Sequence, residues 1–266
     1  MMEFLKYIFL GLVQGLTETI PVSSSGHLMI LKRLLDVNVD FDTISILTNF
    51  GSLIAIMILF REDIFKLIKG FFTYLFKKEK KCKDEYKYCW MIVLGCIPAG
   101  FLGILVSAFD IFEKIENNIK IVGISLIITS ILLFIVRNFK GKKDDDKLGI
   151  KEALTVGCFQ ILGLFPGISR SGSTIVGGMT AGLKRDTAFK YSFMLYMPIS
   201  VAATVLELFD LNIDSSLIFH YISAIFVSCV ITLLVTKWFR NIVNNGKLIY
   251  FSIYCFTVGL LVVLFL

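Results

Sequence analysis

Long apolar blocks alternate with short polar connections along most of this chain. Each block is close to the ~20 residues that an α-helix needs to cross a bilayer, and together the blocks cover residues 40–60, 88–109, 118–136, 188–209, 216–236 and 247–266. The composition agrees with this pattern, since 56% of the 266 residues are hydrophobic and only 18% are charged. We therefore expect an all-α polytopic membrane protein that forms one integral membrane domain over residues 1–266.

Two further regions are apolar but are interrupted in the middle by polar residues. Residues 4–35 contain the break "PVSSSGH" at 21–27, and residues 148–185 contain the break "FPGISRSGST" at 165–174. The apolar stretches on either side are too short for a full crossing, so each region predicts a re-entrant helical hairpin. Polar, irregular backbone at membrane depth is tolerated only where protein or a water-filled cavity surrounds it. The first stretch lacks a signal-peptide cleavage site, so we expect it in the mature protein.

Basic residues gather in the connections that this pattern places on one side of the membrane. Residues 61–87 carry nine of them and residues 137–151 carry six. Basic loops stay in the cytoplasm, so the first hairpin enters from outside and the second from inside, with Asp40 outside and Lys143 inside. The net charge of +6 is then mostly a topology signal, and it argues against a nucleic-acid partner. Residues 62–78 mix lysines with phenylalanines and predict a helix lying on the inner membrane surface.

The two interrupted regions resemble each other when the chain is shifted by 146 residues. Each copy is followed by three apolar blocks, and the two copies have opposite predicted orientations. This arrangement indicates an inverted repeat, with repeat one at about 1–138 and repeat two at about 148–266. The identical pairs are Gly11 and Gly157, Gln14 and Gln160, Leu16 and Leu162, Ser23 and Ser169, Ser25 and Ser171, and Gly26 and Gly172.

The polar side chains at the two breaks have complementary chemistry. A carboxylate, an imidazole and a guanidinium inside a membrane are costly, which makes function the default interpretation. An arginine, several hydroxyls and glycine-exposed amides at a helix start form a cradle for an anion such as phosphate. The predicted catalytic residues are Glu18, Ser24, His27 and Arg170, and the predicted substrate-binding residues are Gln14, Ser23, Ser25, Gly26, Ser169, Ser171, Gly172, Ser173 and Thr174.

These residues suggest phosphoryl transfer. A serine of the first break would be the nucleophile, with Glu18 and His27 adding a proton acceptor and an orienting partner. Arg170 would hold the charge that develops on the phosphoryl oxygens. Two simpler interpretations stay open at this point. Glu18 and Arg170 could form a buried ion pair that only locks the hairpins together, and the serines could serve the turns between short helices.

The segments "QGLTETIPVSSSGH" and "FPGISRSGST" closely resemble the two signature motifs of the bacterial undecaprenyl pyrophosphate phosphatases, the bacitracin-resistance membrane proteins. The resemblance covers essentially the whole chain. It implies removal of one phosphate from undecaprenyl diphosphate, a polyprenyl diphosphate lipid. It also implies recycling of the lipid carrier for peptidoglycan synthesis, a plasma-membrane location among membrane lipids, and an active site that opens to the outer face.

The resemblance also implies a divalent cation, Mg²⁺ or Ca²⁺. The family's acidic motif falls on Gln14 and Glu18, its serine–histidine motif on Ser24 and His27, and its arginine on Arg170. Many members have glutamate where this chain has Gln14. Glu18 is then the one carboxylate in the motif, and we expect substrate oxygens to supply most of the cation's ligands.

Several alternatives remain open after the resemblance is drawn. Attack by Ser24 is favoured, but a phosphohistidine route through His27 is not excluded. The same anion cradle would also suit a polyprenyl-phosphate lipid transporter or flippase, because paired broken helices are frequent in transporters. The oligomeric state, a homodimer included, is not determined by the sequence.

Overall fold

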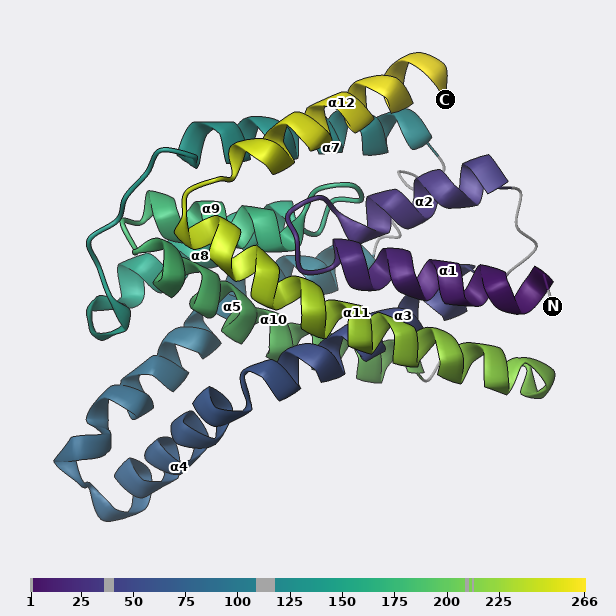
Figure 1. Ribbon diagram of the computed structural model, residues 1–266. Helices are drawn as coiled ribbons and strands as arrows, with labels where there is room; N and C mark the ends of the chain where they lie inside the picture. Colours follow the sequence, from purple (N-terminus) through teal and green to yellow (C-terminus); the bar gives the residue numbers. More distant parts are fainter. Residues whose placement is uncertain (1, 36–40, 109–117, 209–210, 212) are drawn as a thin grey trace.

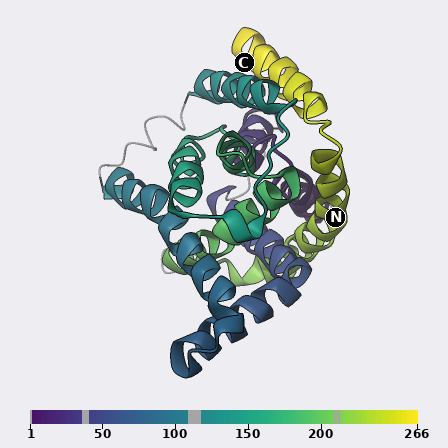
Figure 2. The ribbon, with the colours of Figure 1, turned by 90° about the vertical axis from the view of Figure 1, so that its left-hand side faces the viewer.

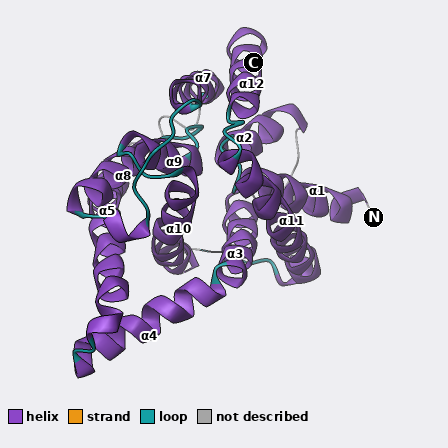
Figure 3. Ribbon diagram, turned by 60° about the vertical axis from the view of Figure 1, so that its left-hand side comes forward, coloured by secondary structure: helices purple, strands orange, loops and turns teal. Residues whose placement is uncertain are grey.

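The computed structural model describes residues 2–35, 41–108, 118–208, 211 and 213–266. Over those residues the chain forms helices and no sheet (Figure 3). In chain order (Figure 1), the helices are α1 (Met2–Thr17), α2 (Ser24–Leu35), α3 (Phe41–Leu59), α4 (Arg61–Lys77), α5 (Lys83–Ala108), α7 (Ile119–Val136), α8 (Ile150–Leu162), α9 (Arg170–Thr180), α10 (Arg185–Leu208), α11 (Ile218–Asn244) and α12 (Ile249–Phe265).

The expected all-α polytopic architecture is confirmed. By length and composition, four helices of the described chain can cross a membrane, and a fifth span is added if the bent pair α3 and α4 counts as one. The shorter apolar helix α12 has 17 residues. Three terminal residues of predicted spans lie outside the described residues: Asp40, the first residue of the span 40–60, and residues 109 and 209, the last residues of two others. The predicted outside position of Asp40 therefore also falls outside them.

Helix α11 runs to Asn244, past the predicted end at residue 236. The added turns are held by contacts outside the apolar block. Phe239 is buried, with its ring 5.5 Å from that of Phe189 on α10, and Arg240 makes two hydrogen bonds to the carboxylate of Asp186. Tertiary packing thus extends the helix beyond what hydropathy alone indicates.

Both predicted breaks separate two helices. The first hairpin, α1 and α2, is interrupted at residues 18–23, and the second, α8 and α9, at residues 163–169. The two tips touch: the hydroxyl of Ser171 donates to the carbonyl of Ile20 over 3.4 Å. A Cβ added to Gly26 would lie 3.2 Å from the Cα of Gly167. Two segments far apart in the sequence therefore form one structure, which we call the hairpin junction (residues 14–27 and 163–174).

Glycines let the hairpin helices approach their neighbours closely, as small residues do at helix contacts in membranes. A Cβ at Gly11 of α1 would lie 2.4 Å from the carbonyl oxygen of Ala224 on α11. At Gly157 of α8 the corresponding distance, to the carbonyl oxygen of Gly95 on α5, is 2.5 Å. The two contacts occupy matching positions of the predicted repeats. They support the inverted repeat, which stays a prediction.

The start of α8, the first helix of the second hairpin, is held in place by contacts with the connection that precedes it. Lys143 donates to the carboxylate of Glu152 over 2.6 Å, and that hydrogen bond holds the pKa of Glu152 below its usual value. The other oxygen of Glu152 accepts from the backbone N–H of Gly149, directly before α8. These contacts satisfy a free amide of the first turn and define where α8 begins.

Candidate active site

Glu18 is the first residue after α1, and its carboxylate gathers the polar side chains of the first hairpin. Gln14, one turn earlier, donates from Nε2 to Oε2 of Glu18 over 2.8 Å. Ser24, the first residue of α2, donates from its hydroxyl to the same oxygen over 2.6 Å. The carboxylate therefore spans the break and is in direct contact with the predicted nucleophile. A short bond between a hydroxyl and a carboxylate is the arrangement that general-base activation requires.

The turn before α2 places Ser24 in this position. Ser23 has a φ of 69°, which is unusual for a residue other than glycine. Its hydroxyl accepts the backbone N–H of Gly26 over 3.2 Å and lies 3.4 Å from the hydroxyl of Ser25. Ser23 thus caps the helix and is buried. Among the three consecutive serines, Ser24 is the one whose hydroxyl reaches Glu18.

His27 makes a different set of contacts. Its Nδ1 lies 2.8 Å from the carbonyl oxygen of Ser23, and its Nε2 lies 2.7 Å from the hydroxyl of Tyr254 on α12. A carbonyl oxygen only accepts, so Nδ1 carries a proton, and Nε2 of the neutral ring accepts from Tyr254. The hydrogen bonds of the described residues thus join Ser24 to Glu18 and His27 to Tyr254.

The second hairpin presents Arg170 at the start of α9. Ser169 caps this helix by accepting the N–H of Gly172 over 3.1 Å, and its own N–H donates to the hydroxyl of Thr129 on α7. Ser173 donates its hydroxyl to the carbonyl of Ser169 and is buried. The cap is the counterpart of the one at Ser23, and it directs the side chain of the next residue into the junction.

Arg170 joins the two hairpins. Its NH2 donates to Oε1 of Glu18 over 2.8 Å, and its NH1 donates to the hydroxyl of Ser200 on α10 over 3.1 Å. The guanidinium carbon lies 4.2 Å from the ring centre of Tyr196, a cation–π contact. Tyr196 in turn donates to the side-chain oxygen of Asn49 on α3. The side chains of Arg170 and Glu18 are only 26% and 8% exposed.

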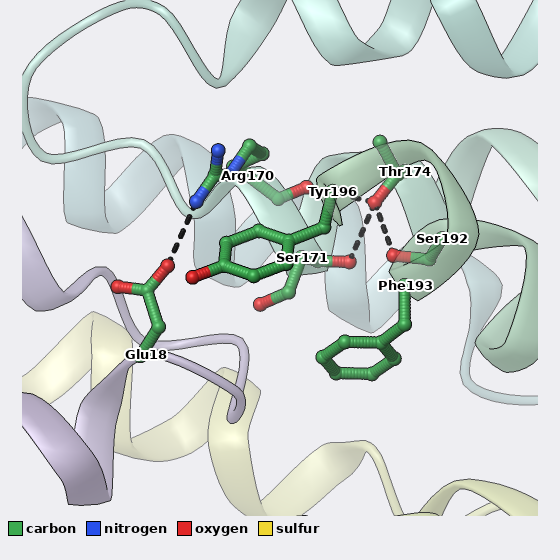
Figure 4. Close-up of a pocket in the computed structure, with 7 residues that line it drawn as sticks. All are labelled: Glu18, Arg170, Ser171, Thr174, Ser192, Phe193 and Tyr196. Atoms are coloured by element: carbon green, nitrogen blue, oxygen red, sulfur yellow. Dashed lines mark hydrogen bonds and ion pairs between the residues drawn. The ribbon is translucent and has the colours of Figure 1, made fainter. Parts of the chain in front are cut away.

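A small cavity lies beside the Glu18–Arg170 pair (Figure 4). Thr174 and Ser192 close one end of it through a hydrogen bond of 2.5 Å. The lining residues are Glu18, Arg170, Ser171, Thr174, Ser192, Phe193 and Tyr196. Ser171 and Thr174, two of the predicted substrate-binding residues, therefore line the cavity.

Some residues of this site were missed in the sequence. Asn49, Ser200 and Tyr196 come from membrane-length helices, and Tyr254 comes from α12. Asn49 carried a usable signal, because an amide in the middle of an apolar block is costly unless it has a partner. Tyr196 and Ser200 gave no such signal, since both residue types are common in apolar helices.

The side chains at the hairpin junction can bind a divalent cation only if the substrate supplies further oxygen ligands. No group of three or more His, Cys, Asp or Glu side chains poised for a metal occurs among the described residues. Glu18 supplies one carboxylate, and Gln14 adds an amide oxygen beside it. Magnesium is commonly held by one or two carboxylates together with substrate phosphates. The residues present therefore fit a substrate-bridged divalent cation.

Comparison with known proteins shows the family of this chain. A family model described as "Bacitracin resistance protein BacA" matches residues 7–261. The chain belongs to the BacA family. Among other BacA-like relatives, it is 40% identical to undecaprenyl-diphosphatase 1 of Bacillus licheniformis, over 99% of this chain and 100% of that protein. It is 41% identical to undecaprenyl-diphosphatase 2 of Bacillus thuringiensis, over 98% and 97%. It is 39% identical to undecaprenyl-diphosphatase of Oceanobacillus iheyensis, over 98% and 96%.

Proposed function

We propose that this protein hydrolyses undecaprenyl diphosphate to undecaprenyl phosphate and inorganic phosphate. In doing so it recycles the lipid carrier of envelope synthesis and confers bacitracin resistance. The names of its full-length relatives support this activity. The observation that carries it structurally is the convergence of Ser24, Glu18 and Arg170, from two hairpins, through hydrogen bonds of 2.6 and 2.8 Å.

The nucleophile is the Ser24 hydroxyl. Its oxygen attacks the terminal phosphorus while Glu18 takes the hydroxyl proton, and the bond from that phosphorus to the bridging oxygen breaks. Undecaprenyl phosphate leaves, and water then cleaves the phosphoserine. The contacts of His27 support this assignment, because its Nε2 already accepts from Tyr254, whereas Ser24 touches a base. His27 holds the turn through the carbonyl of Ser23.

Arg170 binds the phosphate under attack. A guanidinium presents several donors in a fixed plane and can hold two oxygens at once. Tyr196 and Ser200 fix its orientation, so the donors are in place before charge develops on phosphorus. An entering phosphate competes with Glu18 for Arg170, which frees the carboxylate to accept the proton of Ser24.

A divalent cation, Mg²⁺ or Ca²⁺, completes the proposed site. Glu18 and the side-chain oxygen of Gln14 would hold it together with the phosphates of the substrate. When bound, it would neutralise charge on the diphosphate. We further propose that the site opens to the outer face of the plasma membrane. The basic connections at 61–87 and 137–151 support that orientation through the preference of basic loops for the cytoplasm.

The first experiment is phosphate release from undecaprenyl diphosphate by detergent-purified protein, with and without Mg²⁺ or Ca²⁺. Ser24→Ala should lower turnover at least ~100-fold, since it removes the nucleophile. Ser223→Ala is the matched control, because among the described residues that hydroxyl bonds to the carbonyl of Phe219 within its own helix, α11. Near-normal release by Ser24→Ala would contradict the serine mechanism. If folded wild-type protein released no phosphate, a polyprenyl-phosphate transporter would become the better proposal.

A second experiment tests whether Arg170 binds phosphate or only forms an ion pair with Glu18 that holds the two hairpins together. Removing one member of a buried pair leaves an uncompensated charge, so Arg170→Ala alone can fail by misfolding. The double variant Glu18→Gln with Arg170→Gln removes both charges and keeps similar volumes. A cradle predicts a folded and inactive double variant, measured by thermal melting and phosphate release. Recovery of activity in the double variant would show that the pair only locks the hairpins.

A further inference from the structure

Helices α4 and α5 form a further hairpin, distinct from the two hairpins of the junction, whose tip stands away from the rest of the molecule. Figures 1 and 2 show α4 and the start of α5 projecting from the other helices. α4 begins at Arg61, two residues after α3 ends at Leu59, and the two helices are bent by 70°. If α3 crosses the membrane, α4 must run nearly along the membrane surface. This α4–α5 hairpin comprises residues 61–90.

The inward face of α4 is already covered by α5. Gly70 is buried, and a Cβ there would lie 2.5 Å from the Cβ of Glu85. The ring of Phe71 lies 5.1 Å from that of Tyr86, and the ring of Tyr74 lies 4.8 Å from the same residue. The hairpin is therefore a packed unit, and its base is tied to α10 by the salt bridge between Asp63 and Lys190.

A second face of α4 is apolar and exposed. Phe65, Ile68, Phe72 and Phe76 are 71%, 50%, 51% and 77% exposed. Their spacing of three and four residues puts them on one stripe of the helix. The rings of Phe72 and Phe76 stack 6.1 Å apart. Such a stripe on a helix along the surface suits insertion into the boundary between headgroups and acyl chains.

Lysines border this stripe and cluster at the turn of the hairpin. Salt bridges join Lys66 to Glu85 and Lys81 to Glu79. Within the described residues no salt bridge engages the other lysines of the hairpin, all of which are exposed: Lys69, Lys77, Lys78, Lys80, Lys83 and Lys87. Trp90, 45% exposed on α5, follows them at the end of the hairpin, as aromatic residues do at membrane interfaces.

We propose that the α4–α5 hairpin is a binding surface for anionic phospholipids. The apolar stripe enters the leaflet, and the unpaired lysines bind phosphate headgroups that carry a net negative charge. Clusters of four to eight basic residues beside a membrane segment are typical of such recognition. Each lysine near an anionic surface strengthens binding about fivefold. We favour lipid over an aqueous protein partner because the 70° bend sets the axis of α4 nearly along the bilayer surface, where a helix with an apolar stripe bordered by lysines is stabilised by insertion.

The test uses Trp90 as the reporter and needs no substrate. Trp238→Phe removes the other tryptophan of the chain. The variant is placed in bilayer nanodiscs of equal phosphatidylglycerol and phosphatidylcholine, with bromine on the chains of one lipid or of the other. We expect brominated phosphatidylglycerol to quench Trp90 at least twofold more strongly, and added salt to reduce the difference.

Two matched sets of four lysines complete the design. Changing Lys77, Lys78, Lys80 and Lys83 to Gln should abolish the preference. Changing Lys140, Lys142, Lys147 and Lys151, which are exposed in another basic connection, should preserve it. Equal quenching by both lipids in the parent protein would overturn the proposal, and so would absence of quenching by either. Because no phosphate release is measured, either result leaves the proposed phosphatase activity untouched.

Discussion

At the scale of single residues, the chemistry centres on one carboxylate. Glu18 accepts from Gln14, Ser24 and Arg170, which lie on three separate helices. The break after α1 explains why a carboxylate is tolerated here, since it is compensated by a guanidinium and by two neutral donors. The polar residues of the first break were predictable from the sequence. The helix cap at Ser23, the hydrogen bond from Ser24 to Glu18 and the hydrogen bond between His27 and Tyr254 were not.

Gln14→Glu tests the role of the neutral amide beside Glu18. The substitution replaces a hydrogen-bond donor with a second carboxylate about 3 Å from the first, where like charges repel. A divalent cation relieves that repulsion, so we expect lower activity at low Mg²⁺ and a half-saturating Mg²⁺ concentration reduced about threefold or more. A Mg²⁺ titration of phosphate release measures it, with Gln14→Leu as the control that removes the donor without adding charge. An unchanged titration would remove Gln14 from the cation site.

Tyr254→Phe tests the histidine route. The substitution removes the hydroxyl that donates to Nε2 of His27 and leaves the Ser24–Glu18 contact in place. If Ser24 is the nucleophile, we expect turnover to fall by less than ~10-fold, as measured by phosphate release. Tyr250→Phe, one turn earlier on the same helix and 59% exposed, serves as the control. A loss as large as that of Ser24→Ala would favour a catalytic role for His27.

At the scale of helices, the sequence predicted the segments well. The apolar blocks became α3, α5, α7, α10, α11 and α12, and both polar breaks became interruptions between two helices. Hydrophobic pattern and helix-breaking residues act locally, so they can be seen in one sequence. The length of α11 could not be predicted from the sequence, because its last turns depend on contacts of Phe239 and Arg240 with α10.

Gly157→Ala tests how closely α8 must approach α5. The added methyl would lie 2.5 Å from the carbonyl oxygen of Gly95, so the helices must separate, at a cost of about 1–3 kcal/mol. We expect the melting temperature of the detergent-solubilised protein to fall by roughly 3–10 °C. Gly100→Ala on α5 is the control, since no atom of the described part of the chain lies within 4 Å of its added Cβ. That variant should melt at the same temperature or higher, because alanine favours a helix. Equal melting of both variants would contradict the close approach.

At the scale of the whole molecule, two hairpins from the two halves of the chain meet at one site. Matching contacts support the predicted inverted repeat: Gly11 approaches α11 as Gly157 approaches α5. In a similar way, Gly123 approaches Gly259, and Ser130 approaches Ser252, between α7 and α12. In this arrangement each half supplies what the other lacks, a carboxylate with a serine hydroxyl on one side and a guanidinium on the other.

Cysteine labelling tests the orientation of the molecule. In a variant freed of its six native cysteines, a cysteine at Asp40 should react with an impermeant reagent added to intact cells. A cysteine at Lys143 should react only after permeabilisation, because basic connections stay inside. The reverse pattern would put phosphate release on the cytoplasmic side. Labelling of both positions in intact cells would contradict a single orientation.

The sequence by itself determined the membrane architecture, the two broken hairpins, and the set of polar residues at their tips from which the site is built. Each follows from local features, such as the length of an apolar block or a charged residue where lipid-facing residues should be. Only the tertiary structure decided which residues of that set are in contact with one another. It joined Ser24 to Glu18 and His27 to Tyr254, and it brought Tyr196, Ser200 and Asn49 to Arg170. In a membrane protein, lipid-facing and core-facing positions are both apolar. Hydropathy therefore carries little information about the rotation of each helix, and packing between distant segments sets it.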